Sequence, residues 1–298
     1  MDNIQLRRDI NLKNYTTIKV GGLTEYFYQP NGVSEFLNLI NWAKSKSYNC
    51  RIIGAGSNLL IKDIYLRGLT ICTKKMKTIK IHPKTGLVYA ECGVMLPTLA
   101  NLLAKNSCMG GEWAVGIPGT VGGALFMNAG CGDSSISDNL SSVQVIDIES
   151  QEIYEINKED LSFKYRFSSF QENNLLILSA KFYFEPEGDL KSIMKKTQTN
   201  LKKRLASQPY HLPSFGSVFK NPSTNYAGKL IEDAGLKGLK YGGAEISRMH
   251  ANFIVNSSSA TSDDIINLIN LVQQKVIQKK GIMLYPEVRM IGFEHPNI

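Results

Sequence analysis

The pattern of apolar and polar positions changes its period repeatedly along the chain, which predicts a mixture of helices and strands. Short apolar or alternating runs predict strands at Tyr26–Gln29, Arg51–Ile53, Thr78–Ile81, Leu87–Glu91, Val143–Ile148, Glu152–Ile156, Leu175–Phe184 and Ile282–Ile291. Apolar residues three and four positions apart predict helices at Val33–Lys46, Leu96–Lys105, Tyr226–Ala234 and along a stretch that begins near Gly188. Longer loops are expected at Gly110–Asp133 and Ser207–Pro222.

The last helix has the clearest predicted ends in the chain. Thr261 is a suitable N-cap, and Asp263 and Asp264 follow it in the first turn, where negative charge stabilises a helix. Lysines precede Gly281, a residue type that commonly terminates helices. Apolar residues recur between these ends at helical spacing, so we expect one long helix with a buried face.

Length and composition are those of a globular protein with more than one domain. A chain of 298 residues suggests about two domains of roughly 100–200 residues each, and 43% hydrophobic residues are enough to form real cores. The predicted elements fall into three regions, 1–73, 74–187 and 188–298, without internal repeats or low-complexity segments.

The net charge of +8 admits nucleic acid, anionic membranes or small anionic ligands as partners. Nucleic-acid binding would require a basic stripe joined to a known motif, and neither is found. The densest basic stretch is Lys191–Arg204. The preferred interpretation is a solvated helix face, and the alternative is a positive rim around an anionic ligand.

The cysteines and histidines indicate neither disulfides nor a metal site. The five cysteines contain no CxxC pair, and the four histidines are scattered without metal-ligand spacing. A reducing cytoplasm is therefore the expected compartment. The N-terminus is polar, which predicts no signal peptide, and no apolar run is long enough to span a membrane.

The first glycine-rich segment follows a strand and contains Gly54 and Gly56. This pair resembles the start of a dinucleotide fingerprint, but the third glycine is missing and Lys74–Lys77 stands where an acidic residue is needed. Two interpretations stay open, a plain tight turn and a nest of backbone N–H groups that binds a phosphate, with Ser57 and Asn58 as additional donors.

The second glycine-rich segment, Gly116–Gly132, is more specific. Its glycines and alanines remove side chains along a whole surface, while Ile117 and Pro118 supply apolar contact. Such a stretch suits a flat ligand that lies against backbone, and the alternative is a structural loop packed tightly against a neighbour.

Five motifs in order carry a resemblance to a known family. They are Gly54–Leu60, Gly116–Gly130, Tyr165-Arg166, Gly216–Pro222 and Tyr285–Val288. The chain resembles the UDP-N-acetylenolpyruvoylglucosamine reductases, in their shorter second type, from Thr17 to Gly292. That family belongs to the FAD-binding superfamily of the vanillyl-alcohol-oxidase type. The resemblance implies an α+β fold with two FAD-binding subdomains, 1–73 and 74–187, and a smaller α+β substrate-binding domain, 188–298.

The resemblance also implies non-covalent FAD, NADPH as co-substrate and a UDP-sugar as substrate, without nucleic acid, membrane or an obligatory protein partner. It assigns catalysis to Arg166, Ser217 and Glu287, and substrate binding to Tyr165, Arg204, Lys220 and Asn221. The implied FAD-binding residues are Gly54, Ala55, Gly56, Ser57, Asn58, Leu59, Ile117, Pro118, Gly119, Gly122, Gly123, Asn128, Ala129 and Gly130.

The chemistry of these residue types agrees with that assignment. Hydride addition to an enolpyruvyl group builds negative charge on the adjacent carboxylate, which needs a fixed cation and a proton donor. Arg166 can clamp a carboxylate through two hydrogen bonds, and Ser217 matches the proton donor of the family. Each also has an ordinary interpretation, Arg166 as a surface ion pair, Ser217 as a turn cap and Glu287 as an exposed strand residue.

Two other functions remain possible at this stage. A flavin oxidase or dehydrogenase of the same superfamily would often attach FAD to a His or Cys in the first glycine segment, and Gly54–Asn58 contains neither. A non-catalytic flavin- or nucleotide-binding protein would have lost Arg166, Ser217 or Glu287, and all three are present.

Overall fold

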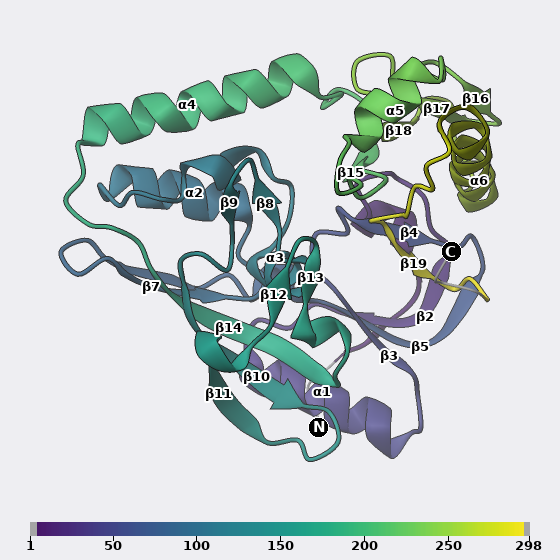
Figure 1. The fold of residues 1–298 in the computed structure, drawn as a ribbon. Coiled ribbons are helices and arrows are strands. Elements are labelled where there is room, and N and C mark those ends of the chain that lie inside the picture. Colours follow the sequence, from purple (N-terminus) through teal and green to yellow (C-terminus); the bar gives the residue numbers. More distant parts are fainter. Residues whose placement is uncertain (1–4, 295–298) are drawn as a thin grey trace. The chain divides into compact units, whose positions relative to one another are not determined.

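The computed structural model describes residues 5–294, which form two compact units, and His295 lies outside this range (Figure 1). The first unit comprises residues 5–6, 27–55 and 68–204, and the second comprises residues 7–26, 56–67 and 205–294. The chain passes from one unit to the other several times, so β2 (Leu23–Tyr28) and β5 (Tyr65–Cys72) each have residues in both.

The first unit contains a five-stranded antiparallel sheet with the strand order β11-β10-β14-β7-β6. These strands are β6 (Ile79–His82), β7 (Leu87–Glu91), β10 (Leu140–Asp147), β11 (Ile153–Asn157) and β14 (Leu175–Tyr183). The unit also contains the helices α1 (Val33–Ser45), α2 (Leu96–Lys105), α3 (Val121–Met127) and most of α4 (Leu190–Ser207). Its short elements are β3 (Cys50–Ile53), η2 (Thr73–Lys75), η3 (Glu112–Gly116), β8 (Gly130–Cys131), β9 (Ser134–Ser135), η4 (Lys158–Asp160), β12 (Phe163–Lys164), β13 (Phe167–Ser168) and η5 (Ser169–Gln171).

Helix α2 shows why the core of the first unit forms where it does. Leu96, Leu99, Ala100 and Leu103 recur at helical spacing and are all buried. They join one apolar cluster with residues of α3 and with the inner faces of β7, β10 and β14. Burying side chains of this kind contributes about 1.5–3 kcal/mol each, so α2 and α3 are held on the sheet by packing.

The second unit combines a small sheet with two helices. The antiparallel order β15-β18-β17-β16 joins β15 (Ser214–Ser217), β16 (Lys240–Tyr241), β17 (Ala244–Ile246) and β18 (Phe253–Asn256). The other elements are β1 (Arg7–Asn11), η1 (Leu12–Tyr15), β4 (Leu59–Ile61), α5 (Ala227–Asp233), α6 (Ser262–Lys280) and β19 (Arg289–Ile291).

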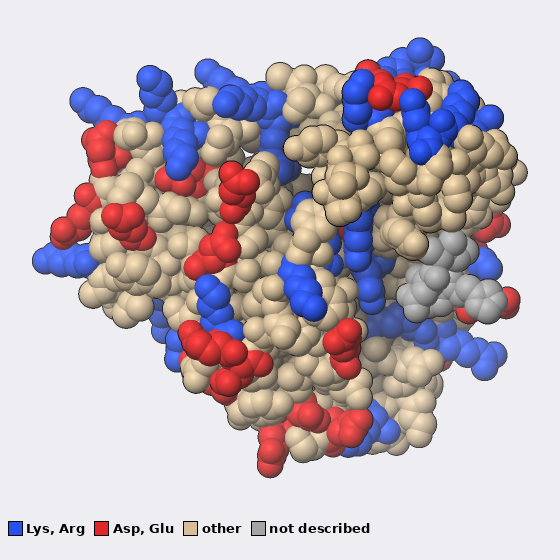
Figure 2. Space-filling view, viewed as in Figure 1, with Lys and Arg blue, Asp and Glu red and all other residues tan. Residues whose placement is uncertain are grey.

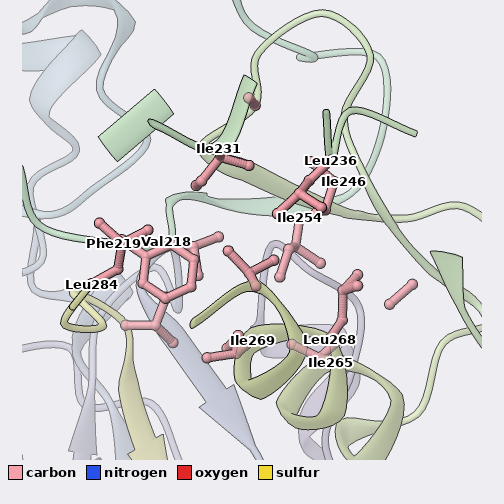
Figure 3. Close-up of a cluster of buried hydrophobic side chains, with 14 of the residues drawn as sticks. Val218, Phe219, Ile231, Leu236, Ile246, Ile254, Ile265, Leu268, Ile269 and Leu284 are labelled. Atoms are coloured by element: carbon pink, nitrogen blue, oxygen red, sulfur yellow. The ribbon is translucent and has the colours of Figure 1, made fainter. Parts of the chain in front are cut away.

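Helix α6 supplies much of the second core, and its predicted ends are confirmed. Thr261 and Asp264 form a capping box, and Gly281 ends the helix in the left-handed conformation. The backbone N–H of Thr261 lowers the pKa of the Asp264 carboxyl. Figure 3 shows how Ile265, Leu268 and Ile269 of this helix project into an apolar cluster with Val218, Phe219, Ile231, Leu236, Ile246, Ile254 and Leu284.

Most predicted elements are confirmed within one to three residues at their ends, but three predictions were wrong. The Gly110–Asp133 segment is not one loop, because it contains η3 and the helix α3. The Ile282–Ile291 segment is a strand only at β19, with one isolated antiparallel bridge between Pro286 and Phe219 before it. The predicted Ser207–Pro222 loop also contains β15. Within residues 5–294, every helix is too short or too polar to cross a membrane.

Candidate functional site

The two glycine-rich segments meet inside the first unit. A Cβ atom added at Gly54 would lie 2.4 Å from the hydroxyl oxygen of Thr120, which is 1% exposed. Thr120 is also the N-cap of α3, where its hydroxyl accepts a hydrogen bond from the N–H of Gly123 at 3.3 Å. Gly54 is therefore required because Thr120 packs directly against its backbone.

From Gly56 onward, the first glycine segment belongs to the second unit. Gly56 has φ +67°, and a Cβ there would lie 2.0 Å from the carbonyl oxygen of Tyr15, so only glycine fits. Beyond it, the side chain of Asn58 donates to the carbonyl of Glu287 at 3.1 Å, and the N–H of Arg289 donates to the carbonyl of Asn58 at 3.0 Å. These bonds continue into the parallel pairing of β4 with β19.

The second glycine segment uses most of its amides within the protein. The N–H of Val121 donates to Val94 at 2.8 Å, and the N–H of Gly122 donates to Cys92 at 2.8 Å. A Cβ at Gly122 would lie 2.9 Å from the Cβ of Cys92, whereas one at Gly123 would have only the Thr120 hydroxyl within contact, at 3.5 Å. Gly122 is thus needed for the close packing of α3 against Cys92, whereas Gly123 leaves its backbone exposed with no side chain covering it.

Arg166 lies in a strained turn. The pairing of β12 with β13 makes Tyr165 and Arg166 the two turn residues of a hairpin, and Arg166 has φ +55°. Positive φ is uncommon for residues other than glycine, and such strain often marks a functional position. The guanidinium lies over the Tyr165 ring at 4.9 Å from its centroid and donates to the carbonyl of Gly130 at 3.4 Å.

The hairpin is anchored on the C-terminal end of α3. The side chain of Asn128 donates to the carbonyl of Lys164 at 3.0 Å, and the hydroxyl of Ser168 donates to the carbonyl of Phe126 at 2.7 Å. Gln171 adds a bond to the same Phe126 carbonyl at 2.8 Å. The first unit therefore brings together Arg166 and the Asn128–Gly130 part of the glycine segment.

Three polar side chains on one face of helix α4 contact residues at and just before the start of the second glycine segment. Lys196, Asn200 and Arg204 lie four residues apart and face η3. Lys196 forms an ion pair of 3.5 Å with the buried Glu112, and Asn200 donates to the carbonyl of Glu112 at 3.1 Å. Arg204 donates to the carbonyl of Gly116 at 3.2 Å. The remaining lysines of α4 account for much of the blue surface over this helix in Figure 2.

Ser217 and Glu287 lie on neighbouring segments of the second unit. Ser217 ends β15 directly after Gly216, which has φ +80° and no neighbour that a Cβ would meet. The N–H of Glu287 donates to the carbonyl of Val218 at 2.7 Å, and the N–H of Lys220 donates to the carbonyl of Tyr285 at 2.9 Å. Ser217, Lys220 and Glu287 are all half-buried, so their side chains retain access to a ligand.

Asn221 serves a structural contact in this arrangement. Its side-chain oxygen accepts a hydrogen bond from the N–H of Ala227 at 3.0 Å, at the first residue of α5. Its exposed position is compatible with a ligand contact, but the oxygen already satisfies a helix N-terminus.

The residues present fit FAD in each unit taken by itself. Among residues 5–294, the buried side-chain oxygen of Asn128 has no hydrogen-bond partner, and buried acceptors of this kind normally have one. Gly123, five residues earlier, offers bare backbone on the exposed side of α3. Within the same described range, the amides of Ala55, Gly56 and Ser57 donate to no oxygen, which leaves them available to an anionic group such as a diphosphate.

Two positioning side chains were not predicted. Thr120 is the N-cap of α3 and accepts from the N–H three residues later, but no helix was expected in a segment so rich in glycine. For Asn252, nothing in the neighbouring sequence indicates its contacts with Phe219, 33 positions away. Across residues 5–294, the structure has no group of three or more His, Cys, Asp or Glu residues arranged for a metal ion.

Comparison with known proteins gives two family matches. Residues 24–157 match the FAD binding domain family, and residues 208–291 match the family described as UDP-N-acetylenolpyruvoylglucosamine reductase, C-terminal domain. The UDP-N-acetylenolpyruvoylglucosamine reductase of Prochlorococcus marinus subsp. pastoris is 64% identical over 99% of this chain and 100% of its own. That of Synechococcus sp. strain CC9311 is 46% identical over 97% of this chain and 94% of its own.

A solved structure agrees with these matches. The crystal structure of UDP-N-acetylenolpyruvylglucosamine reductase from Thermus caldophilus has a TM-score of 0.80 at 29% identity, covering 96% of this chain and 99% of its own. The expected α+β fold, with an FAD-binding part and a smaller C-terminal part, is confirmed.

Proposed function

Because the chain belongs to the UDP-N-acetylenolpyruvoylglucosamine reductase family, we propose that it reduces UDP-N-acetylglucosamine enolpyruvate to UDP-N-acetylmuramate for peptidoglycan synthesis. It is an FAD-dependent oxidoreductase with NADPH as reductant and small-molecule substrates. Bound FAD would supply the redox chemistry, which is hydride transfer between NADPH and the substrate. Every other step depends on the residues of the chain itself.

The observation that carries this proposal is the pairing of the Ser217 segment with the Glu287 segment. Hydride addition to the methylene carbon breaks the carbon–carbon double bond and leaves an electron pair on the neighbouring carbon. That carbon must take a proton before the product is complete. We assign the proton to the hydroxyl of Ser217, which stands at the end of a strand with a bare glycine before it.

Arg166 is assigned to the substrate carboxylate, onto which the negative charge delocalises. Its guanidinium is oriented by the Tyr165 ring and the Gly130 carbonyl, so less side-chain freedom is lost when it binds an anion. A planar guanidinium can hold both carboxylate oxygens. Glu287 is assigned a role beside Ser217, in which it orients the proton-donating hydroxyl or the substrate.

Tyr165, Lys220, Asn221 and Arg204 are proposed as substrate ligands. Lys220 is the strongest of these on chemical grounds, because it follows Ser217 on the same half-buried segment and an ammonium suits a diphosphate or carboxylate. Arg204 and Asn221 have the structural contacts described above, so their binding roles would be additional to them.

The FAD-binding assignment follows the same two glycine segments. We propose that the Gly54–Leu59 segment contributes the unbonded amides of Ala55, Gly56 and Ser57, and that the Gly123 surface and the Asn128 oxygen contribute contacts along the second segment. The boundaries 1–73, 74–187 and 188–298 remain our proposed domain division. The free thiols of all five cysteines favour a reducing cytoplasm as the compartment, and we expect catalysis to need no second protein chain.

The function is tested by anaerobic reduction of the enzyme with NADPH, followed by addition of the enolpyruvyl substrate. We expect the visible absorbance of oxidised flavin to return, with UDP-N-acetylmuramate as the product in mass spectrometry. UDP-N-acetylglucosamine, which lacks the enolpyruvyl group, is the control and should leave the flavin reduced. Rapid reoxidation by oxygen with no response to the enolpyruvyl substrate would instead identify a flavin oxidase.

A further inference from the structure

The three residues that follow Ser217 have all but one of their backbone groups bonded. The N–H of Val218 donates to the carbonyl of Asn252 at 2.9 Å, and the carbonyl of Val218 accepts from Glu287. The N–H of Phe219 donates to the side-chain oxygen of Asn252 at 3.0 Å, and the side-chain amide of Asn252 donates to the carbonyl of Phe219 at 2.9 Å. The N–H of Lys220 donates to Tyr285.

The side chain of Asn252 thus makes the two hydrogen bonds to Phe219 that the backbone of a neighbouring strand would otherwise make. The pairing of β15 with β18 shifts register between Ser214 and Ser217, and Gly216 bends the chain with φ +80°. Such an irregularity leaves the following backbone groups without regular ladder partners. The amide side chain of Asn252 presents an acceptor and a donor in the order that a neighbouring strand would, and it is 4% exposed.

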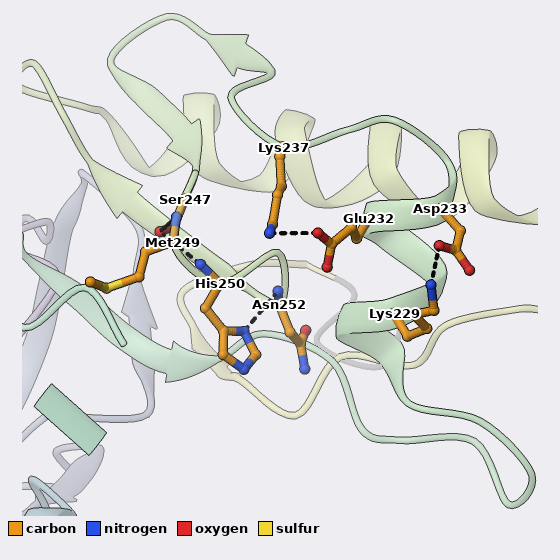
Figure 4. A network of polar contacts seen from close by, with 8 residues as sticks. All are labelled: Lys229, Glu232, Asp233, Lys237, Ser247, Met249, His250 and Asn252. Atoms are coloured by element: carbon orange, nitrogen blue, oxygen red, sulfur yellow. Dashed lines mark hydrogen bonds and ion pairs between the residues drawn. The ribbon is translucent and has the colours of Figure 1, made fainter. Parts of the chain in front are cut away.

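A polar turn in front of β18 holds Asn252 in place. The hydroxyl of Ser247 accepts from the N–H groups of Met249 at 3.1 Å and His250 at 3.3 Å, and the Nδ1 of His250 accepts from the N–H of Asn252 at 3.2 Å. Figure 4 shows this chain of contacts from Ser247 to Asn252. The His250 ring also packs edge-on against Phe253 at 4.8 Å between centroids.

We infer that Asn252 is a positioning residue, which fixes the backbone after Ser217 so that the serine hydroxyl is held where it delivers its proton. This inference rests on the proposed function for its kinetic consequence. The geometric part, in which Asn252 clamps Phe219, stands on the hydrogen bonds alone. A residue that only filled the core would affect stability, whereas a positioning residue affects the half-reaction that needs the proton.

Asn252→Ala removes both side-chain bonds to Phe219, while Asn256→Ala is the matched control. Asn256 ends β18, four residues after Asn252, and also makes two side-chain bonds, with the carbonyl of Ile18 at 3.1 Å and the N–H of Ala260 at 2.8 Å. We expect Asn252→Ala to slow flavin reoxidation by the enolpyruvyl substrate about tenfold to a hundredfold, as misplaced catalytic groups do. Reduction by NADPH should stay within about twofold of wild type in both variants.

Asn252→Asp supplies a readout that a structural role would not produce. A protonated carboxyl keeps one acceptor and one donor, as the amide does, while the ionised form has no donor for the Phe219 carbonyl. Burial favours the protonated form. The rate of reoxidation in Asn252→Asp, divided by that in Asn252→Ala at the same pH, should therefore rise as the pH is lowered.

Hydrogen exchange tests the clamp without any enzyme activity. The amide of Phe219 should lose protection in Asn252→Ala and keep it in Asn256→Ala, where the Ala260 amide should lose it instead. Normal reoxidation in Asn252→Ala, or a rate ratio that does not change with pH, overturns the positioning role. If the wild-type enzyme does not respond to the enolpyruvyl substrate, the proposed function fails, and unchanged Phe219 exchange in Asn252→Ala would overturn the clamp separately.

Discussion

The backbone N–H of Glu287 donates to the carbonyl oxygen of Val218 at 2.7 Å, across 69 residues of sequence. This bond joins the backbone of the acidic residue to the residue that directly follows Ser217, at the end of β15. An acid and a hydroxyl on hydrogen-bonded segments are suited to proton delivery, because the bond limits how far the two segments can move apart.

Ser217→Ala should block the second half-reaction and spare the first. Reduction by NADPH requires no proton from this segment, whereas the carbanionic centre formed in the substrate must be protonated. Loss of a positioned general acid costs about 10²–10⁴-fold. Stopped-flow absorbance should show normal flavin bleaching with NADPH and slow recovery with the enolpyruvyl substrate.

Ser217→Cys is the conservative comparison and should retain more activity than alanine, since a thiol still carries a transferable proton. Equal slowing of both phases in Ser217→Ala would mean that the serine only shapes its segment. Slowing of neither phase would make Glu287 the first candidate for the donor.

FAD should be bound without a covalent bond. Gly54–Leu60 contains no His or Cys, and the two buried cysteines that lie against the glycine segments, Cys72 and Cys92, are poor nucleophiles. Burial raises the pKa of Cys72, whose sulfur lies 3.6 Å from the carbonyl of Gly54, and burial raises the pKa of Cys92 to about 12. Acid precipitation should leave flavin in the supernatant. Flavin in the pellet, released by Cys131→Ser, would show attachment at that exposed cysteine.

The KM for the UDP-sugar should rise with ionic strength. A chain with a net charge of +8 attracts a diphosphate over a screening length of about 30 Å at 0.01 M salt and about 8 Å at 0.15 M. Steady-state assays across this range measure the effect, with a non-ionic osmolyte at matched osmolarity as control. A constant KM would make the positive charge a general surface property.

Local signals were sufficient for much of the fold. The Thr261 cap, the acidic first turn and Gly281 located α6 within a residue because helix ends are specified by residues close in sequence. The order of short motifs likewise identified the candidate residues, because each motif is contiguous, and their roles stay predictions. What such signals could not predict are contacts between distant segments.

Helix α3 and the final strand illustrate that limit. Gly122 and Gly123 have poor helix propensity, yet the helix forms because Thr120 caps it and Gly122 packs on Cys92, 30 residues earlier. The Ile282–Ile291 run forms a ladder only where β4 lies beside β19. The earlier part of the run bonds to Val218 and Lys220 instead, which its own pattern does not reveal.

The pKa of His250 should rise in Lys237→Gln. Burial lowers this pKa from its ordinary 6.5, and Lys237 lowers it further. The neutral ring is therefore favoured in the folded chain, so the free energy of unfolding is highest above the ordinary pKa and falls as the pH drops below it. The ion pair of Lys237 with Glu232, at 2.7 Å, also breaks in the variant, and the freed Glu232 favours protonation further.

Proton NMR titration of the His250 ring measures this change. Lys229→Gln is the matched control, because Lys229 pairs with Asp233 at 2.6 Å on the same helix and is separate from the imidazole network in Figure 4. Equal titration curves in wild type and Lys237→Gln would contradict the electrostatic account.

Gly123→Ala should separate FAD binding from protein packing. A Cβ at this exposed position would meet only the Thr120 hydroxyl, at an ordinary 3.5 Å, and alanine is favoured over glycine in a helix by about 1 kcal/mol. The apoprotein should therefore be as stable as wild type or more so. If the cofactor lies against this surface, the added methyl group should weaken FAD binding about tenfold or more, as steric contact at a ligand does.

Gly122→Ala is the opposite case, since its Cβ would clash with Cys92 at 2.9 Å. It should lower the melting temperature of the apoprotein, with weaker FAD binding only as a consequence. Thermal unfolding of the apoproteins and fluorescence titration with FAD measure the two effects independently. Unchanged FAD affinity in Gly123→Ala would remove this face of α3 from the proposed binding surface and leave the Asn128 oxygen as its main contact.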